Sequence, residues 1–318
     1  MPISVVIPTV DRPQLLGKSL ETFFSQDVEA KEIVVIDASD SPETLALFQS
    51  FHGAATVSPN GLSRERRRTR VVYRQASARG AACQRNEGVE IASQPFILFM
   101  DDDVELQQGC LAKLWSAMIS DERIGGVSSM ILNQKYTSPG LASRVLYFLV
   151  SGEKSETFAG RCLGPVLALL PEDRDELPEV VPVEWLNTTC TLYRREALPM
   201  PVFPSHFTGY SMAEDINLSL TVGKAWKLVN ARTARIFHNS GSGPYKPTGA
   251  ALAKMSLINR HYIMTKTLGR TTVLDYAKLV LVEAFGIVTS LRYARAWAEL
   301  PAILLGKVQG ILTIATGR

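Results

Sequence analysis

The chain has 318 residues, 46% of them hydrophobic and 20% charged, with a formal net charge of +3. This composition is typical of a soluble α/β protein, and the length allows one large domain or a domain with an appendage. The net charge is too small to indicate nucleic-acid binding without a concentrated basic surface, so we expect no nucleic-acid partner.

The first fifty residues alternate between buried strands and amphipathic helices. Residues 3–7 and 32–37 are apolar runs that predict strands, whereas residues 11–13 and 41–43 begin helices, with Asp11 able to cap the first. This alternation predicts a parallel, doubly wound sheet. The strand pattern begins at the N-terminus, so we expect no signal peptide, and four scattered cysteines without a CxxC pair favour a reduced, cytoplasmic protein.

Residues 53–70 are predicted to form a solvated loop that ends in a basic run of Arg64, Arg66, Arg67, Arg68 and Arg70. A third strand follows from Arg70. Small residues from Ala78 onward then begin a helix. The start of a helix with nearby arginines can hold phosphate, and ordinary helix packing is the alternative.

Three consecutive aspartates, Asp101, Asp102 and Asp103, follow the apolar residues 96–100. The apolar run predicts a strand buried on both faces, and ligands of open α/β sheets bind beyond the carboxyl ends of such strands. Adjacent carboxylates repel one another unless a cation or hydrogen-bond donors lie among them. The pattern therefore predicts a hard divalent cation, with a solvated acidic turn as the alternative.

The middle of the chain is less regular. A helix over 108–120 and a strand over 125–132 are followed by a short apolar helix over 141–150 and a proline-rich surface loop over 165–182. Strand-like composition returns at 184–193, which contains Trp185.

A second acidic pair, Glu214 and Asp215, begins a helix after a Gly/Ser-rich loop. Two short strands are predicted over 226–230 and 234–237, and the second ends at His238. Acidic residues are common at helix starts because of the helix dipole, and a single histidine is more often structural than a ligand. Each feature indicates a functional site only if it lies next to the three aspartates.

Residues 250–318 are predicted to be helical, over 251–268, 274–291 and 300–312. Charged residues interrupt each apolar run, so we expect no transmembrane helix. We expect these helices to lie in a membrane interface, with packing on the core or on another subunit as the alternative.

Five of these elements, in this order, resemble a family 2 glycosyltransferase over about residues 3–270. They are the Val-Val-Ile-Pro-Thr start at 5–9, the strand ending at Asp37, the helix over 79–88, the three aspartates, and Glu214-Asp215 followed by His238. The resemblance implies an α/β fold of the GT-A type, with a Rossmann-like, mostly parallel sheet flanked by helices and a C-terminal helical extension.

The resemblance also implies domain boundaries. Residues 1–250 would form the glycosyltransferase domain, with a nucleotide-sugar-binding half at 1–132 and an acceptor-binding half at 133–250. Residues 251–318 would form the helical region that contacts the membrane.

For the donor, the resemblance implies roles near the nucleotide. Pro8 and Thr9 would line the nucleobase and ribose pocket, Asp37 would bond to the base, and Arg79 and Arg85 would lie near the donor. The aspartates match a DxD motif, in which Asp103 binds the metal and Asp101 contacts the ribose, the metal or its water shell. Asp102 would lie at the variable middle position on the donor side and tolerate replacement best. His238 would be the third metal ligand.

For the acceptor, the resemblance implies that Asp215 is the general base. Glu214 would lie on the acceptor side, and Trp185 would form a platform for the acceptor sugar unless it is a core residue. The implied reaction is inverting transfer of a sugar from a nucleotide diphosphate donor, most often a UDP-sugar in this family, with Mn²⁺ or Mg²⁺. The acceptor would be a glycan or lipid-linked hydroxyl in polysaccharide biosynthesis, at the inner face of the cell membrane.

The sequence leaves the sugar, the acceptor, the linkage and the oligomeric state open. The choice of sugar depends on a few side chains and loop shapes, and the last fifty residues, which match the family only loosely, leave the acceptor and the membrane attachment open. A non-catalytic nucleotide-sugar-binding scaffold is the alternative, and Asp215 argues against it. A dinucleotide-dependent oxidoreductase is excluded by the lack of a GxGxxG turn after the first strand, and no lysine-rich phosphate loop supports nucleotidyl transfer.

Overall fold

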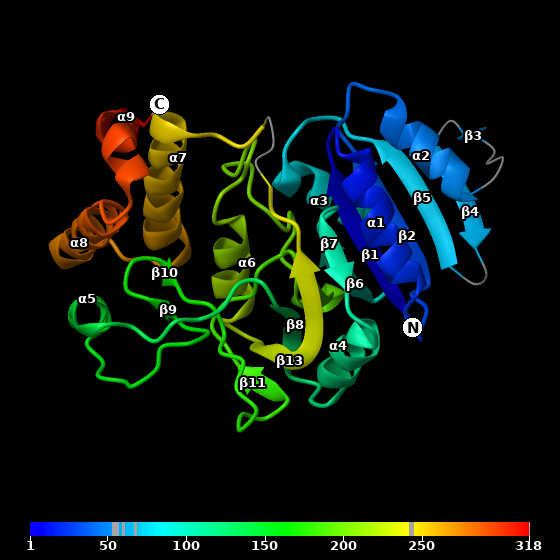
Figure 1. Cartoon of the computed structure of the whole chain (residues 1–318), viewed down its shortest axis with the longest axis horizontal. Coiled ribbons are helices and arrows are strands. Elements are labelled where there is room, and N and C mark those ends of the chain that lie inside the picture. Colours follow the sequence, from blue (N-terminus) through cyan, green and yellow to red (C-terminus); the bar gives the residue numbers. More distant parts are fainter. Residues whose placement is uncertain (53–56, 59–60, 67–68, 242–244, 318) are drawn as a thin grey trace.

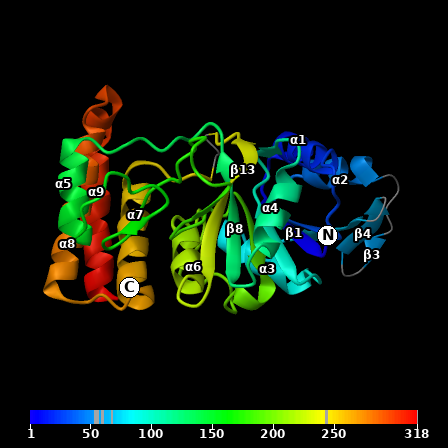
Figure 2. The ribbon, with the colours of Figure 1, turned by 90° about the horizontal axis from the view of Figure 1, so that it is seen from below.

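The computed structural model describes residues 1–52, 57–58, 61–66, 69–241 and 245–317. Within them, a twisted sheet carries helices on both faces, and a separate group of helices lies beside the sheet (Figures 1 and 2). The strand order is β11-β13-β8-β12-β6-β1-β2-β5-β4-β3, and β7 pairs with β13. The predicted α/β class is confirmed.

The centre of the sheet is parallel, because β6, β1, β2 and β5 are joined by helical crossovers. Every residue of β1 is buried, and alternate side chains face opposite layers. Val5 and Ile7 pack in a cluster with α1 and α4, whereas Val6 packs with α3 and α6. This two-sided burial explains why the strands are continuous apolar runs rather than alternating ones.

Beyond β6 the sheet becomes mixed. β12 runs antiparallel between β6 and β8, and β13 is parallel to β8. The far end of β13 pairs with β7, which places His238 opposite Val104. Two segments more than a hundred residues apart therefore meet at the carboxyl end of β6.

The helices and strands have the following bounds. The strands are β1 (Ile3–Thr9), β2 (Glu32–Asp37), β3 (Val57–Ser58), β4 (Gly61–Arg66), β5 (Thr69–Gln75), β6 (Phe96–Met100), β7 (Val104–Leu106), β8 (Ile124–Ile131), β9 (Cys162–Leu163), β10 (Leu167–Ala168), β11 (Val180–Pro182), β12 (Cys190–Arg194) and β13 (Lys227–His238). The helices are α1 (Pro13–Phe24), α2 (Glu43–His52), α3 (Ala81–Ile91), α4 (Cys110–Ile119), α5 (Leu141–Ser151), η1 (Arg195–Ala197), α6 (Glu214–Val222), α7 (Gly249–Tyr262), η2 (Ile263–Thr267), α8 (Val273–Ser290) and α9 (Ala294–Thr316).

Three predictions about local structure are wrong. The segment predicted as a basic loop contains β4, which pairs antiparallel with β5, while Arg67 and Arg68 lie outside the described residues. The two strands expected between Trp226 and His238 are one strand with irregular register. Asp11 does not cap α1: its φ is +50°, and its carboxylate accepts a hydrogen bond from Tyr245 instead.

Among the described residues, Trp297–Thr316 in α9 is long and apolar enough to cross a membrane by length and composition, so the expectation of no membrane-spanning segment stays a prediction. In this structure, however, one face of α9 packs on α7. Gly306 permits the close approach, since a Cβ atom there would lie 2.2 Å from the carbonyl oxygen of Ala250. Glu283 of α8 joins the helices further by pairing with Arg260 of α7 and Lys307 of α9.

The α7–α9 contact predicts opposite effects for the same substitution at two helical glycines. We expect Gly306→Ala to lower the free energy of unfolding by about 1–3 kcal/mol, because backbone must move to admit the methyl group. Gly286→Ala in α8 meets no heavy atom within 4 Å and should raise stability by up to about 1 kcal/mol. Urea unfolding followed by circular dichroism measures both, and equal stability of the two variants would contradict this packing.

Candidate active site

The site forms where the loops after β1 and β6 meet the end of β13. β1 and β6 are parallel neighbours, so the residues that follow them emerge at the same edge of the sheet. The Thr9 hydroxyl donates to Asp102 Oδ2 at 2.6 Å, which joins the two loops. His238 arrives from β13 and lies next to Asp103, with 3.1 Å between His238 Nε2 and Asp103 Oδ1.

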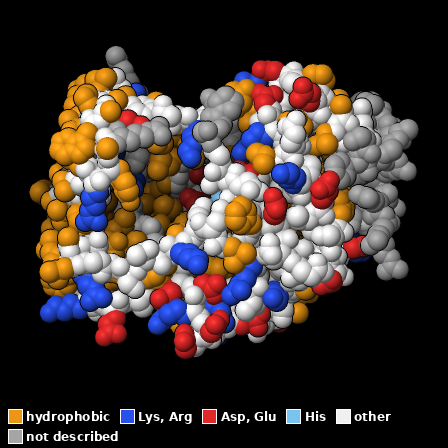
Figure 3. All heavy atoms as spheres, in the orientation of Figure 1, with side chains coloured by type: hydrophobic (Ala, Val, Ile, Leu, Met, Phe, Trp, Pro, Cys, Tyr) orange, Lys and Arg blue, Asp and Glu red, His pale blue; other side chains and the backbone are white. Residues whose placement is uncertain are grey.

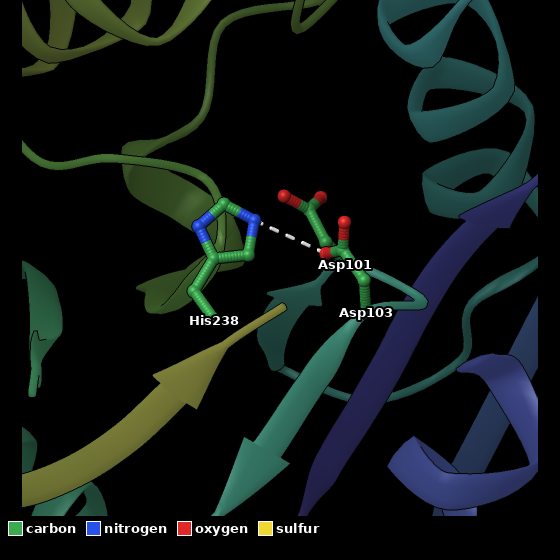
Figure 4. Close-up of side chains that lie close together, drawn as sticks. All are labelled: Asp101, Asp103 and His238. Carbon is green, nitrogen blue, oxygen red and sulfur yellow. Dashed lines mark ion pairs between the residues drawn. The ribbon is translucent and has the colours of Figure 1, made fainter. Parts of the chain in front are cut away.

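Asp101, Asp103 and His238 form a cluster of three possible metal ligands. One ligand atom from each lies within 4.8 Å of the others, and the side chains face a common space (Figure 4). Two carboxylates and an imidazole are donor types that suit Mn²⁺, and the carboxylates also suit Mg²⁺. Asp103 Oδ1 is buried and lies beside the His238 imidazole, so the donor set fits a divalent cation.

The charges of this cluster are tuned by its neighbours. Burial alone would raise the pKa of the Asp103 carboxyl, but hydrogen bonds and charge from His238 and Arg12 more than offset it and hold that pKa below its ordinary value. Burial lowers the pKa of His238, but the hydrogen bond and the charge of Asp103 outweigh burial and raise this pKa above its ordinary value. Asp103 is thus kept ionised, as a metal ligand requires.

Asp102 points away from this cluster into the protein. Its side chain is fully buried and accepts from Thr9, and its Oδ1 lies 2.6 Å from Arg12 Nη2. Its own carbonyl accepts a hydrogen bond from Ser19 of α1. Burial raises the pKa of Asp102 to about 7, although Arg12 and Thr9 offset part of the effect. This burial argues against the expectation that Asp102 tolerates replacement best; that expectation and the contact of Asp102 with the donor both stay predictions.

Arg12 was not predicted as a site residue, yet it contacts two of the three aspartates. Its guanidinium reaches Asp103 Oδ2 at 2.9 Å as well as Asp102. The sequence contained a signal for this role: Arg12 follows β1, whose end lies beside the end of β6 in any parallel arrangement of the two. The sequence pattern Asp-Arg-Pro was interpreted only as the start of a helix.

Arg85 connects the two acidic motifs. Its guanidinium is 4% exposed and pairs with Asp101 at 2.6 Å and with Glu214 at 2.9 Å. It also lies over the Phe203 ring, 5.9 Å from the centroid. Arg85 was predicted to lie near the donor. It borders the cavity, but its charge is used to hold two carboxylates in place.

The acidic pair at the start of α6 is delivered by a loop with unusual backbone geometry. Gly209, Ser211 and Ala213 all have positive φ angles. Gly209 forms an isolated bridge with Gly80, the residue before α3. The two backbones are so close that a Cβ atom added at Gly80 would lie 3.1 Å from the Gly209 nitrogen. The start of α3 therefore holds this loop in place. Left-handed non-glycine residues of this kind are strained and often occur at functional sites.

Burial raises the pKa of Asp215 to about 6, while the Ile216 amide and the charge of Arg85 offset part of the shift. Burial and the neighbouring Asp215 charge also raise the pKa of Glu214. A carboxylate with a pKa close to neutrality takes up a proton more readily than an ordinary one, and it is still largely ionised at pH 7.

A cavity of about 540 Å³ joins most of the predicted residues. Tyr245 and Lys246, which were not predicted, also border it, and the Arg79 guanidinium lies 4.9 Å from the centroid of the Tyr245 ring. Arg79 in addition pairs with Asp40. The predicted residues that line the cavity are Pro8, Thr9, Arg79, Arg85, Asp101, Asp102, Asp103, Glu214, Asp215 and His238.

Two predicted residues do not line this cavity. Asp37 is 1% exposed, and its carboxylate accepts hydrogen bonds from Ser39 and Tyr73. A direct bond from Asp37 to a base stays a prediction, and in this structure the carboxylate orders the turn after β2. The Trp185 indole donates to the carbonyl of Leu169 at 2.7 Å, so its expected acceptor platform also stays a prediction.

Comparison with known proteins supplies the remaining information. The sequence model of the family described as glycosyl transferase family 2 matches residues 4–169, which is more than half of the chain. The chain belongs to glycosyl transferase family 2. The matched region contains the three aspartates but ends before Asp215 and His238, whose interest therefore rests on geometry.

One curated relative is the GalNAc(5)-diNAcBac-PP-undecaprenol beta-1,3-glucosyltransferase of Campylobacter jejuni. It is 31% identical over 112 residues, which cover 35% of this chain and 33% of that protein. The chain thus spans about a third of the length of the curated relative that it matches.

Two solved structures share the fold of this chain at 14% sequence identity. The mannosyltransferase PcManGT from Pyrobaculum calidifontis, in complex with GDP-Man and Mn²⁺, matches with a TM-score of 0.54 over 98% of this chain and 87% of that one. GalNAc-T7 with UDP, GalNAc and Mn²⁺ matches with a TM-score of 0.53 over 89% and 55%. These likenesses support the GT-A type of fold.

The buried position of Asp102 predicts a loss of stability on its removal. Asp102→Ala leaves the Thr9 hydroxyl and the Arg12 guanidinium without their acceptor, and should lower the free energy of unfolding by about 2–3 kcal/mol. Asp40→Ala is the control, because that side chain is 85% exposed. Thermal unfolding measures the difference, and an equal melting temperature for the two variants would refute the structural role.

Proposed function

We propose that this family 2 glycosyltransferase transfers a sugar, with inversion, from a nucleotide diphosphate donor to a hydroxyl of a glycan or lipid-linked acceptor. One observation carries the proposal: a possible metal cluster and a carboxylate of raised pKa, Asp215, border the same cavity. A scaffold subunit that only binds nucleotide sugars would have no need for the second group.

On the donor side, we propose that Asp103, Asp101 and His238 hold Mn²⁺ or Mg²⁺. Such an ion would neutralise charge on the leaving diphosphate when bound. Arg12 keeps Asp103 in position and ionised, and Arg85 holds Asp101 in position. Pro8, Thr9 and Arg79 line the cavity around them, which supports their proposed contacts with the nucleotide.

On the acceptor side, we propose that Asp215 is the general base. The acceptor oxygen forms a bond to the anomeric carbon as the bond from that carbon to the diphosphate oxygen breaks, and Asp215 takes the hydroxyl proton. A single displacement of this kind inverts the anomeric configuration. Arg85 pairs with Glu214, the residue before Asp215, and this ion pair orders the start of α6.

The relative's name supports the substrate classes, because that protein is named for a glycan attached through PP to undecaprenol. We propose the same class of acceptor here, used at the cytoplasmic face of a membrane in polysaccharide synthesis. The two solved structures contain GDP-Man or UDP with Mn²⁺. They support a nucleotide-sugar donor for this chain. We propose a UDP-sugar because it is the most frequent donor in this family.

We further propose that α5, α8 and α9 contact the membrane. Figures 1 and 2 show these helices side by side, and hydrophobic side chains gather on that side of the molecule (Figure 3). Arg144, Lys154 and Arg292 are exposed on or beside this surface, which complements an anionic bilayer. The apolar surface consists of Leu141, Val145, Phe148, Leu149, Val273, Leu274, Tyr276, Val280, Leu281, Val288, Tyr293, Trp297, Leu304, Leu305, Val308, Ile311 and Leu312.

The base assignment predicts a rate that depends on pH and on Asp215. Since the base must be ionised, kcat should fall about tenfold per pH unit below about pH 6 and level off above pH 7. Asp215→Asn should lower kcat by about 100-fold or more with donor binding retained.

Transfer of the sugar to acceptor, measured by chromatography between pH 4.5 and 8, tests both statements. Asp175→Asn, at a 98% exposed side chain, is the matched control. Unchanged transfer in Asp215→Asn, or a flat pH profile in the unmodified enzyme, would refute the assignment.

The membrane proposal predicts that charge on the apolar surface weakens binding to lipid. We expect Leu149→Glu in α5 and Val280→Glu in α8 each to reduce sedimentation with phosphatidylglycerol vesicles, because a carboxylate must then enter the interface. Met200→Glu is the control, at a 68% exposed apolar side chain outside these helices. If all three variants sediment like the unmodified protein, this surface does not bind the membrane.

A further inference from the structure

A second and larger cavity, of about 1190 Å³, lies between the glycosyltransferase sheet and the helical region. Its walls come from the end of α5, from β9, from the later turns of α6 and from the turn that joins η2 to α8. It shares no lining residue with the cavity that holds the aspartates.

The lining of this second cavity is basic. It contains six cationic side chains and three carboxylates, an excess of three positive charges (six minus three), and one of these cations, Lys227, pairs with Asp121 outside the lining. The six cations are Arg161, Lys224, Lys227, Lys266, Arg270 and Lys278, and the three anions are Glu153, Glu184 and Asp275.

The carboxylates are already engaged elsewhere. Arg161 pairs with both Glu153 and Glu184, and Asp275 accepts from the Thr272 hydroxyl in the capping box of α8. Among the residues that the structure describes, no carboxylate lies within ion-pair distance of Lys266, Arg270 or Lys278. The charge of Asp275 acts on Arg270 and Lys278, but no ion pair neutralises either of them or Lys266, so the turn before α8 and its first part present a net positive charge. Such a cluster attracts a ligand with more than one negative charge.

The second cavity adjoins the proposed catalytic base through α6. Glu214 and Asp215 line the first cavity, whereas Ser219, Leu220 and Gly223 line the second. Ser219 lies one helical turn after Asp215, about 6 Å along the axis, and its hydroxyl donates to the Asp215 carbonyl at 2.8 Å. The second cavity therefore comes within about one helical turn of Asp215.

The same cavity borders the apolar surface. Val150 and Ser151 at the end of α5 line it, as does Lys278 of α8. Leu274 and Leu281 lie four residues before and three residues after Lys278, so they are its neighbours along the helix, and both are exposed. A ligand with an anionic group at Lys278 and an apolar chain would thus find apolar side chains directly beside its charge.

We propose that this cavity binds the diphosphate of a lipid-linked acceptor, with the lipid along α5 and α8 and the glycan directed toward Asp215. The inference rests on the proposed function and locates its acceptor. Lys266, Arg270 and Lys278 neutralise the diphosphate. None of the three belongs to the donor site, so donor binding is independent of them.

Farnesyl diphosphate is a suitable soluble probe, with EDTA present so that a metal-dependent donor site does not bind it. Isothermal titration should show binding to the unmodified chain, and the double variant Lys266→Gln/Lys278→Gln should bind at least about tenfold more weakly, a loss of about 1.4 kcal/mol. Lys18→Gln, at an exposed lysine of α1, should bind like the unmodified chain. Equal affinity of the double variant and the unmodified chain would overturn the proposal.

Inorganic pyrophosphate and farnesol separate the two parts of the ligand. Both should bind more weakly than farnesyl diphosphate. Pyrophosphate binding as tight as that of farnesyl diphosphate would overturn the lipid-linked acceptor, and equally tight farnesol binding would overturn the diphosphate contact.

Titration of UDP with Mn²⁺ on the same samples separates this inference from the proposed function. If the unmodified chain binds UDP with Mn²⁺ but does not bind farnesyl diphosphate, the inference about the acceptor cavity is overturned and the proposed function is not. Loss of metal-dependent nucleotide binding in the unmodified chain overturns the proposed function instead.

Discussion

Five carboxylates meet at one end of this sheet, and their mutual repulsion is the constraint on which the site depends. Asp101, Asp102 and Asp103 follow β6, while Glu214 and Asp215 begin α6. Buried carboxylates are tolerated only when cations or hydrogen-bond donors face them. Two arginines provide most of this compensation: Arg12 faces Asp102 and Asp103, and Arg85 faces Asp101 and Glu214.

The compensation is uneven, and the unevenness gives each carboxylate a different character. Asp102 is enclosed and serves to hold the β1 and β6 loops together through Thr9 and Arg12. Asp103 stays ionised opposite His238. Asp215 has no ion pair among the residues that the structure describes, and burial raises its pKa. Carboxyl groups in adjacent environments with separated pKa values are the arrangement that lets one bind a cation while another accepts a proton.

Much of this arrangement could be predicted from sequence, because it follows from strand ends. Apolar runs that end in polar residues predicted β1, β2 and β6, and the parallel order of β1 and β6 in the structure brings Thr9 and the aspartates to the same edge. The partners of the aspartates could not be predicted in the same way. Arg12 and Arg85 lie in helix starts and helices, where an arginine is usually solvated, and their burial depends on packing between layers.

Other errors have related physical causes. Periodicity does not distinguish an exposed middle aspartate from a buried one, so the burial of Asp102 was not predicted. The strand β4 lies in a basic segment, where composition favoured a loop, but backbone pairing with β5 determines the structure. The apolar surface shared by α5, α8 and α9 was predicted only for the C-terminal helices, because α5 is over a hundred residues earlier and joins them through tertiary packing on α8.

The central claim is that the cluster of Asp101, Asp103 and His238 holds a divalent cation on which the donor diphosphate binds. Crystals grown with UDP and Mn²⁺, with diffraction measured near the manganese edge, test it most directly. The account predicts one anomalous peak among the Asp101 and Asp103 carboxylates and the His238 imidazole, in contact with the diphosphate. A bound UDP whose diphosphate has no anomalous peak beside it, or a manganese peak away from these three side chains, would contradict the account.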